Sequence, residues 1–550
     1  MLSNRSEVKK FCATDIGAVS RVGIEAVRNC IWPVDGHVYD MIYTSVLDSF
    51  IDYVSTADER SADLCMSDTA FFDYLVQTAH YNLLKNIATK RGLSLVTSES
   101  SLTLISPEWL EVGVYYDKIF QVQPHVRELQ KIYRNFKYNR HRIAACFRCI
   151  GIPSNSRWIF GATTLNWLEG KFLEDSKQVH VFRDWNDTYW MPSRSLKSTA
   201  YREECQRLKH RVADPLMESI RDRLVNVDLS LDWESIAQAF GDRLSTLSII
   251  YDRVLAAKHA PLEIIATAEN DPRRKIFLVA LQRMGIKVTG FLHGDPIYGV
   301  YKQPYTIAMT MGHIKTYITP SATSADLHNY HYGNGFGDRF NTKFVGYQTD
   351  YYSRVSMTSG TYSGKTPNSL EKVMIVGFPM NTIRYYDDHS LFFYHKLLLE
   401  ISLISALRKI GCFVIYRAHP DRLNHIVKLI SPMVDNMSVD SFSKELSMVD
   451  TLIFSHPTTS TFGESLLTNK NMILLENRSC SSWDSLGRHY IEKRCHFVDV
   501  LEDDYGQPGV NIDQLATALR TNDGAPRKSE NTEFVDYYWR DMEPTPLEVS

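Results

Sequence analysis

An arginine and a histidine precede a proline at the end of an apolar segment, within residues 412–421. Arg417 and His419 are two residues apart, so they lie on the same face of an extended chain. Pro420 cannot continue a central strand, which places His419 at the rim of a sheet. There the imidazole can donate a hydrogen bond to a phosphate oxygen. We interpret the pair as phosphate-binding; the alternative is a strand-ending turn with a surface histidine.

A second polar cluster follows the apolar residues 451–454 and consists mainly of hydroxyl side chains. The cluster comprises Ser455, His456, Thr458, Thr459, Ser460, Thr461 and Glu464. Hydroxyl residues cap helices, and a helix N-terminus also presents free N–H groups that bind phosphate. Four consecutive hydroxyls exceed what capping requires, so we predict a second phosphate- or nucleotide-binding segment. Glu464 either completes a capping box with Thr461 or binds a ribose hydroxyl.

Carboxylates follow two apolar segments in the first half of the chain. Glu269 has no evident local duty and is a candidate general base or nucleophile. Asp271 precedes a proline and has the position of a helix N-cap, so it is a candidate with a structural alternative. His293 and Asp295 flank a glycine that permits close approach of the backbone to a ligand. These four residues are our candidate catalytic groups.

Alternating strands and helices must position these side chains. In the second half, apolar strands are expected at 372–379, 412–420, 451–457 and 471–477, with helices between them. In the first half, strands are expected at 157–162, 179–184, 262–270, 287–294, 317–319 and 343–346. This order predicts parallel sheets with right-handed crossovers. Ligands of such sheets lie beyond the carboxyl ends of the strands, where all the candidates fall.

The sequence therefore predicts an α/β protein with two Rossmann-like domains facing a cleft and a mostly helical N-terminal extension. The helical region is expected at 1–150, where the segment 71–91 has apolar residues at helical spacing and ends at Gly92. The first Rossmann-like domain is expected at 151–350 and a linker rich in Ser, Thr and Gly at 351–370. The second domain follows at 371–505 and a helical tail at 506–550.

Composition excludes several classes of function. The chain of 550 residues has a net charge of -3, which favours neither nucleic acid nor an anionic membrane. A basic run at 131–148 is interpreted as a solvated face or linker, with a membrane-surface or partner patch as the alternative. No apolar segment reaches the roughly 18 residues of a membrane helix, and the N-terminus lacks a secretory apolar region. We expect a cytoplasmic protein with reduced thiols, in which a lone Cys146–Cys149 pair forms no zinc site.

Several of these segments together resemble a family of bacterial enzymes. The passage FLHGDP and the later strand end KFVGYQ are similar to the first domain of GT-B surface-polysaccharide transferases. KVMIVGFP, YRAHPD and VDTLIFSHPTTSTFGESLLTNKNMILLE resemble their donor domain. The family includes Kdo transferases, CDP-glycerol glycerophosphotransferases and several sialyltransferases, which use cytidine nucleotide donors. The likeness covers about residues 260–500, and residues 1–150 match no family that we can name.

The resemblance implies roles for individual residues. His419 would contact the donor phosphate, and Ser460 and Thr461 would line the same phosphate or the cytidine. The family's acidic position falls near Glu269, Asp271 or Asp295, but this chain lacks the paired-acid-then-glycine signature of the sialyltransferases.

We therefore expect transfer of a sugar from a CMP-linked donor to a glycan or lipid-linked glycan, without a cofactor. Kdo is the first candidate for that sugar. No Asp-x-Asp motif marks a metal site in the donor half. The partners are the nucleotide donor and the acceptor, and the enzyme would work in the cytoplasm, alone or beside the membrane in a biosynthetic complex. Alternatives are a CDP-glycerol or CDP-ribitol phosphotransferase, a non-catalytic nucleotide-binding scaffold and a sugar epimerase on the same fold.

Overall fold

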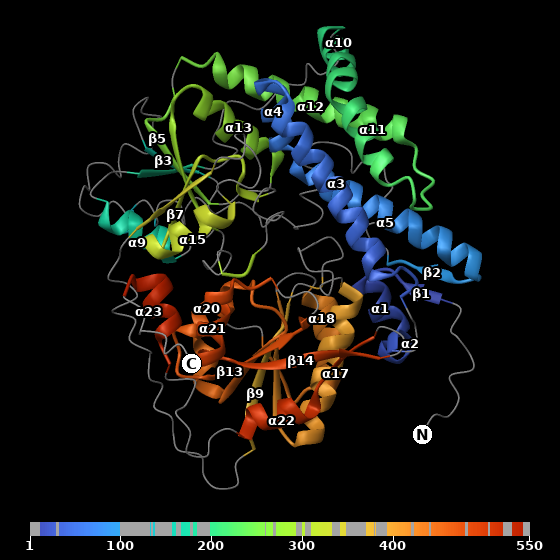
Figure 1. Ribbon diagram of the computed structural model, residues 1–550, viewed down its shortest axis with the longest axis vertical. Helices are drawn as coiled ribbons and strands as arrows, with labels where there is room; N and C mark the ends of the chain where they lie inside the picture. Colours follow the sequence, from blue (N-terminus) through green and yellow to red (C-terminus); the bar gives the residue numbers. More distant parts are fainter. Residues whose placement is uncertain are drawn as a thin grey trace.

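The computed structural model contains two parallel sheets, one in each half of the chain, with helices packed around them (Figure 1). The described residues are 11–28, 32–98, 133, 136–137, 157–160, 167–176, 180–183, 199–258, 260–267, 271–292, 300–302, 310–332, 342–347, 370–378, 380, 393–419, 423–438, 442–478, 482–503, 507–520 and 531–542. The expected α/β class with Rossmann-like sheets is confirmed. The expected linker and most of the basic run lie outside the described residues.

The first sheet has six parallel strands in the order β4-β3-β5-β6-β7-β8. Its strands are β3 (Arg157–Phe160), β4 (His180–Arg183), β5 (Glu263–Thr267), β6 (Lys287–Phe291), β7 (Thr316–Thr319) and β8 (Lys343–Gly346). Its helices are α9 (Trp167–Asp175), α10 (Thr199–Leu208), α11 (Asp214–Arg223), α12 (Trp233–Leu255), α13 (Pro272–Arg283) and α15 (Ala322–Tyr332). A π-helical turn at Lys209–Ala213 joins α10 to α11. We call this first sheet and its helices the first unit.

The second sheet has seven strands in the order β11-β10-β9-β12-β13-β14-β15, and only the last pair is antiparallel. Its strands are β9 (Lys372–Val376), β10 (Phe413–Arg417), β11 (Asn436–Ser438), β12 (Thr451–Phe454), β13 (Asn471–Glu476), β14 (His496–Glu502) and β15 (Pro508–Val510). Its helices are α17 (Phe393–Ile410), α18 (Leu423–Ile430), α19 (Phe442–Glu445), α20 (Ser460–Leu466), α21 (Ser485–Arg494), α22 (Ile512–Arg520) and α23 (Glu533–Arg540). Single 3-10 turns occur at Ser431–Met433 and Leu446–Met448. Strand β15, which lies beyond residue 505, pairs with β14 at the end of this sheet. We call this second sheet and its helices the second unit.

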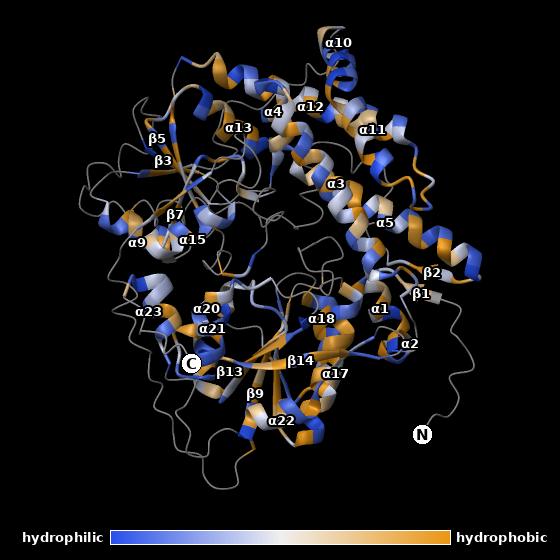
Figure 2. Cartoon of the chain, in the orientation of Figure 1, coloured by the Kyte–Doolittle hydropathy of each residue, from blue (hydrophilic) through white to orange (hydrophobic). Residues whose placement is uncertain are grey.

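Hydrophobic residues concentrate on the central strands of the second sheet, whereas α10 at the periphery is mostly hydrophilic (Figure 2). Strands β9 and β12 are buried over nearly their whole length, as expected for a parallel sheet covered on both faces. No helix in the described part of the chain is long and apolar enough to span a membrane. The cysteines that the structure describes, at positions 12, 65, 205, 412 and 495, are buried free thiols.

The N-terminal region packs on both units. It contains α1 (Ile16–Val22), α2 (Ile24–Arg28), α3 (Gly36–Thr56), α4 (Glu59–Ser67) and α5 (Thr69–Arg91). It also contains a short parallel pair, β1 (Phe11–Ala13) with β2 (Ser94–Val96). Helices α3 and α4 contact α11 and α13 of the first unit, and α1 contacts α18 of the second. The expected helix at 71–91 is confirmed, and Gly92 ends it in the left-handed conformation with a φ of 66°.

Residues that follow strands of the first sheet contact the second unit. Tyr301 follows β6, and its ring contacts His456 at the carboxyl end of β12, with ring centroids 5.2 Å apart. Tyr301 also forms a β-bridge with Trp483. On the same junction the Ser321 hydroxyl, which follows β7, donates to the carbonyl of Tyr538 in α23. Residues beyond the strand ends of one unit therefore contact those of the other.

Gly346 ends β8 within the VG passage of the sequence and lies against the start of α15. A Cβ atom there would come within 2.4 Å of the Ala322 nitrogen and 2.5 Å of the Ser321 carbonyl carbon. Because both contacts are to backbone, no side-chain rotation can relieve them. Packing of the helix against the strand end therefore accounts for this glycine without a ligand.

We predict that Gly346→Ala lowers the free energy of unfolding by about 1–3 kcal/mol, the usual cost of overpacking. Gly509→Ala in β15 is the matched control, since its nearest neighbour would be 3.7 Å away in ordinary contact. Urea denaturation of both variants measures the difference. Equal midpoints for the two variants would show that α15 can move away from β8 without cost.

Candidate functional site

Glu400 of α17 joins the carboxyl ends of three neighbouring strands in the second sheet. Its carboxylate accepts hydrogen bonds from the backbone N–H of Phe378 at 3.2 Å, the Tyr416 hydroxyl at 2.5 Å and the Ser455 hydroxyl at 3.2 Å. These residues belong to the ends of β9, β10 and β12. Glu400 itself is fully buried. The polar edge of the sheet is therefore built around a buried carboxylate.

Lys396 lies one helical turn before Glu400 and supplies the opposite charge. It is 1% exposed, and its ammonium group also lies over the ring of Phe378. Burial raises the pKa of Glu400, and the charge of Lys396 together with the three hydrogen bonds opposes that rise. A buried charge is tolerated only when it is paired and hydrogen-bonded. The hydrogen bonds of Glu400 therefore fix the strand ends relative to α17.

His456 follows β12 and lies at the junction between the units. Its ring packs edge-to-face between Tyr301 and Phe378. Its Nδ1 accepts the backbone N–H of Thr458 at 3.1 Å, so the neutral ring carries its hydrogen on Nε2. Burial, reinforced by the charge of Lys396, lowers the pKa of His456 well below its usual value. At neutral pH this imidazole is uncharged.

Arg417 and His419 lie at the end of β10, as the sequence suggests. The strand ends at Arg417, and both side chains are half-buried. Arg417 Nη1 forms an ion pair with Glu445 at 3.1 Å, and its guanidinium lies over the ring of Phe442. Part of the Arg417 charge is thus compensated within the protein. Binding of a phosphate by this pair stays a prediction.

The hydroxyl cluster has more structural duties than its sequence indicates. Thr459 is the N-cap of α20 and accepts the N–H of Phe462. The Thr458 hydroxyl lies 2.6 Å from His456 Nδ1, and Ser455 bonds to Glu400. Capping therefore needs one hydroxyl, and two more organise the strand ends. Thr461 is half-buried and remains a candidate, as does Ser460, the first residue of α20.

Glu464 does not form the expected capping box, because the N-cap of α20 is Thr459 and not Thr461. Glu464 is exposed, and the charge of Arg417 acts on its carboxylate. Desolvation by the surrounding protein raises the pKa of Glu464, and the charge of Arg417 opposes the rise. The carboxylate is therefore free of a local structural duty at the helix start, and its proposed contact with a ribose hydroxyl stays a prediction.

Of the candidates in the first unit, the structure describes Asp271, while Glu269, His293 and Asp295 lie outside the described residues. Asp271 is the N-cap of α13 and accepts the backbone N–H of Arg273 at 2.9 Å. It also forms an ion pair with the Arg273 guanidinium at 2.5 Å. Burial would raise the pKa of Asp271, but its contacts with Arg273 outweigh that effect and lower it. A carboxylate whose charge is compensated by an arginine and whose pKa is lowered is a poor general base, so Asp271 acts as a helix cap.

The sequence interpretation did not identify Lys396, Glu400 or Tyr416 as parts of the site. A signal was available, because Lys396 and Glu400 are charged residues at i, i+4 spacing within an otherwise apolar segment. A charged pair in a helix that is hydrophobic all round must be compensated in the core. The described residues contain no group of His, Cys, Asp and Glu side chains arranged to hold a metal ion.

No family model matches the chain, and no curated protein matches it. Among solved structures, it is similar to UGT2 from Phytolacca americana complexed with UDP-2fluoro-glucose and pterostilbene, at 9% identity and a TM-score of 0.30 over 70% of this chain and 86% of that chain. A variant of Os79 from O. sativa in complex with UDP is 9% identical, with a TM-score of 0.32 over 76% of this chain and 93% of that chain. A UDP-glucosyltransferase from Polygonum tinctorium is 8% identical, with a TM-score of 0.27 over 70% of this chain and 98% of that chain. Likenesses at this level do not identify a family.

We predict that Glu400→Leu destabilises the protein by about 3–5 kcal/mol, because it leaves the nearby Lys396 charge buried without this carboxylate and removes the acceptor of the Tyr416 and Ser455 hydroxyls. The double variant Glu400→Leu with Lys396→Met should recover most of that loss, since an apolar pair of similar volume often replaces a buried ion pair at little cost. Urea denaturation measures both. A double variant as unstable as the single one would show that Glu400 stabilises the fold through its hydrogen bonds and not through Lys396.

Proposed function

We propose that this chain is a glycosyltransferase of the GT-B type, which transfers a sugar from a nucleotide-linked donor to a glycan acceptor. The observation that supports this proposal is the contact between residues at the carboxyl edges of the two parallel sheets, represented by Tyr301 and His456. Ligands of Rossmann-like sheets bind at these edges. A donor on one edge and an acceptor on the other would meet at this junction.

In this proposal the second unit holds the donor. His419 and Arg417 offer hydrogen-bond donors at the end of β10, and Thr461 offers a hydroxyl in the first turn of α20. These groups suit an anionic phosphate. The neutral His456 and the aromatic rings around it would exclude water from the junction. In the same proposal the first unit binds the acceptor.

The reaction forms a bond between an acceptor hydroxyl oxygen and the anomeric carbon of the sugar. The bond from that carbon to the donor phosphate breaks, and its electron pair leaves with the nucleotide. A carboxylate takes the proton of the hydroxyl, and hydrogen-bond donors on the phosphate stabilise the charge that develops on it.

The resemblance makes a CMP-linked Kdo the first donor to test, with a glycan or lipid-linked glycan as acceptor. CDP-glycerol and a UDP-linked hexose are the comparison donors. Calorimetry with CMP, CDP and UDP, followed by turnover with each donor, tests the proposal. Binding of none of these nucleotides and no turnover would end it.

We predict that His419→Ala reduces transfer by roughly 10²–10³-fold, the usual effect of removing one preorganised donor to a developing charge. His425→Ala is the matched control, because His425 is a half-buried histidine six residues further along, in α18. Steady-state rates and circular dichroism of both variants provide the measurement. Equal rates in wild type and His419→Ala would show that His419 is only a turn residue.

We also predict that transfer continues in EDTA. The donor half of the sequence contains no Asp-x-Asp motif, so the leaving phosphate must be stabilised by protein donors. Initial rates with and without the chelator are the measurement. A loss in EDTA that magnesium restores would contradict this prediction.

A further inference from the structure

Helix α5 connects the carboxyl edges of both sheets. Its first residue, Thr69, receives a hydrogen bond from Lys275 in the second turn of α13, the helix that follows β5. Eleven residues later, His80 Nε2 accepts from the indole of Trp32 at 3.4 Å and lies close to His395 in the first turn of α17. This part of α5 spans about 16 Å. It therefore runs from the first unit to the second across their junction.

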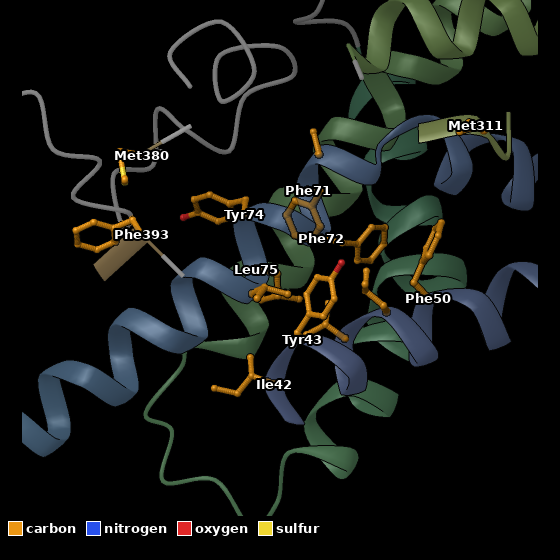
Figure 3. Packing of buried hydrophobic residues seen from close by; sticks show 14 of the residues in the cluster. Ile42, Tyr43, Phe50, Phe71, Phe72, Tyr74, Leu75, Met311, Met380 and Phe393 are labelled. Carbon is orange, nitrogen blue, oxygen red and sulfur yellow. The ribbon is translucent and has the colours of Figure 1, made fainter. Parts of the chain in front are cut away.

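A polar stripe lies along this part of α5. The residues Thr69, Asp73, Gln77 and His80 share one face, because they are spaced by three or four positions. Thr69, Gln77 and His80 are at most 4% exposed, whereas Asp73 is half-buried. The rest of the helix is mainly apolar, and Tyr74 extends toward Met380 and Phe393 of the second unit (Figure 3). Asp73 is thus the accessible member of the stripe.

Asp73 differs from two neighbouring carboxylates, Asp68 and Asp271, which are held by guanidinium groups. Asp68 is bound at two points by Arg243 of α12, at 2.7 and 2.5 Å. Asp271 is held by Arg273. Asp73 makes no hydrogen bond with any residue that the structure describes, and its nearest opposite charge is that of Lys275. It is therefore available to bind a substrate group.

We propose that Asp73 is the catalytic base of the transfer, taking the proton from the acceptor hydroxyl as that oxygen attacks the anomeric carbon. The inference rests on the proposed glycosyltransferase function. The proton would pass to Asp73 and then to solvent when the product leaves, while the electron pair of the broken bond leaves with the nucleotide. This role would be supplied by the N-terminal region, for which the sequence indicates none.

The electrostatic surroundings suit this role. Burial raises the pKa of Asp73 to about 7, and the charge of Lys275 limits the rise. Other charges near this face form the ion pairs Asp68–Arg243 and Asp271–Arg273. Burial, reinforced by His395, lowers the pKa of His80 to about 3 and keeps it neutral. A base with a pKa near the working pH is the most effective. Transfer should rise with pH through this value, as the carboxylate forms.

The test compares Asp73→Asn with wild type and with Asp228→Asn. Asp228 is exposed and pairs with Lys90, which lies near the C-terminal end of α5. Asp228→Asn therefore makes the same chemical change, carboxylate to amide, away from the junction. We expect Asp73→Asn to lower kcat by roughly 10²–10⁴-fold, the range for a general base. Nucleotide binding, measured by calorimetry, should be unchanged, and Asp228→Asn should behave as wild type.

A second variant tests whether the pKa of Asp73 sets the pH dependence of transfer. Lys275→Met removes the cation that lowers the pKa of Asp73, so the rising limb of the pH–rate profile should move to higher pH. If kcat of Asp73→Asn stays within about 3-fold of wild type, Asp73 is not the base. If Lys275→Met leaves the rising limb of the pH–rate profile at the same pH, the role of Asp73 is likewise overturned. In both cases the transferase function stands. Absence of transfer by the wild type with every donor would instead overturn the proposed function, and this inference with it.

Discussion

The buried carboxylate of Glu400 is the constraint on which the polar edge of the second sheet depends. A charge in the core costs several kcal/mol of desolvation unless hydrogen bonds and a nearby opposite charge, here that of Lys396, offset that cost. Glu400 obtains its hydrogen bonds from the ends of β9, β10 and β12. Satisfying this carboxylate therefore fixes the relative positions of three strand ends. The positions of Arg417, His419 and His456 follow from it.

The same edge explains why two strand-end histidines behave differently. His456 is enclosed by Tyr301 and Phe378 and lies near the Lys396 cation, so protonation is disfavoured. His419 lies two residues beyond β10 and keeps access to solvent. His456 is therefore enclosed and neutral, while His419 lies at the rim, where the proposed phosphate site requires it. Similar His-Pro sequences thus have distinct environments, because one strand end is at the junction and the other at the rim.

The strands, the helix ending at Gly92 and the cap at Asp271 could be predicted from the sequence, because they depend on local periodicity and capping chemistry. The roles of the hydroxyl groups in the cluster after β12 could not be predicted in this way. Ser455 bonds to a glutamate 55 residues away, and that partner is visible only after folding. The candidate cap at Thr461 was wrong for a local reason, since α20 begins at Ser460 and its N-cap is Thr459. Helix boundaries are the least predictable part of such an interpretation.

The N-terminal region shows how far tertiary packing can alter the meaning of a residue. Asp68 and Asp73 are five residues apart, and nothing in the sequence separates their roles. Arg243 binds Asp68 at two points in the core, so this carboxylate is a structural ion pair. Among the residues that the structure describes, Lys275 is the charged group near Asp73, which is half-buried. A protein that satisfies one buried carboxylate fully and its neighbour hardly at all incurs a cost in stability, and such costs are concentrated where function requires them.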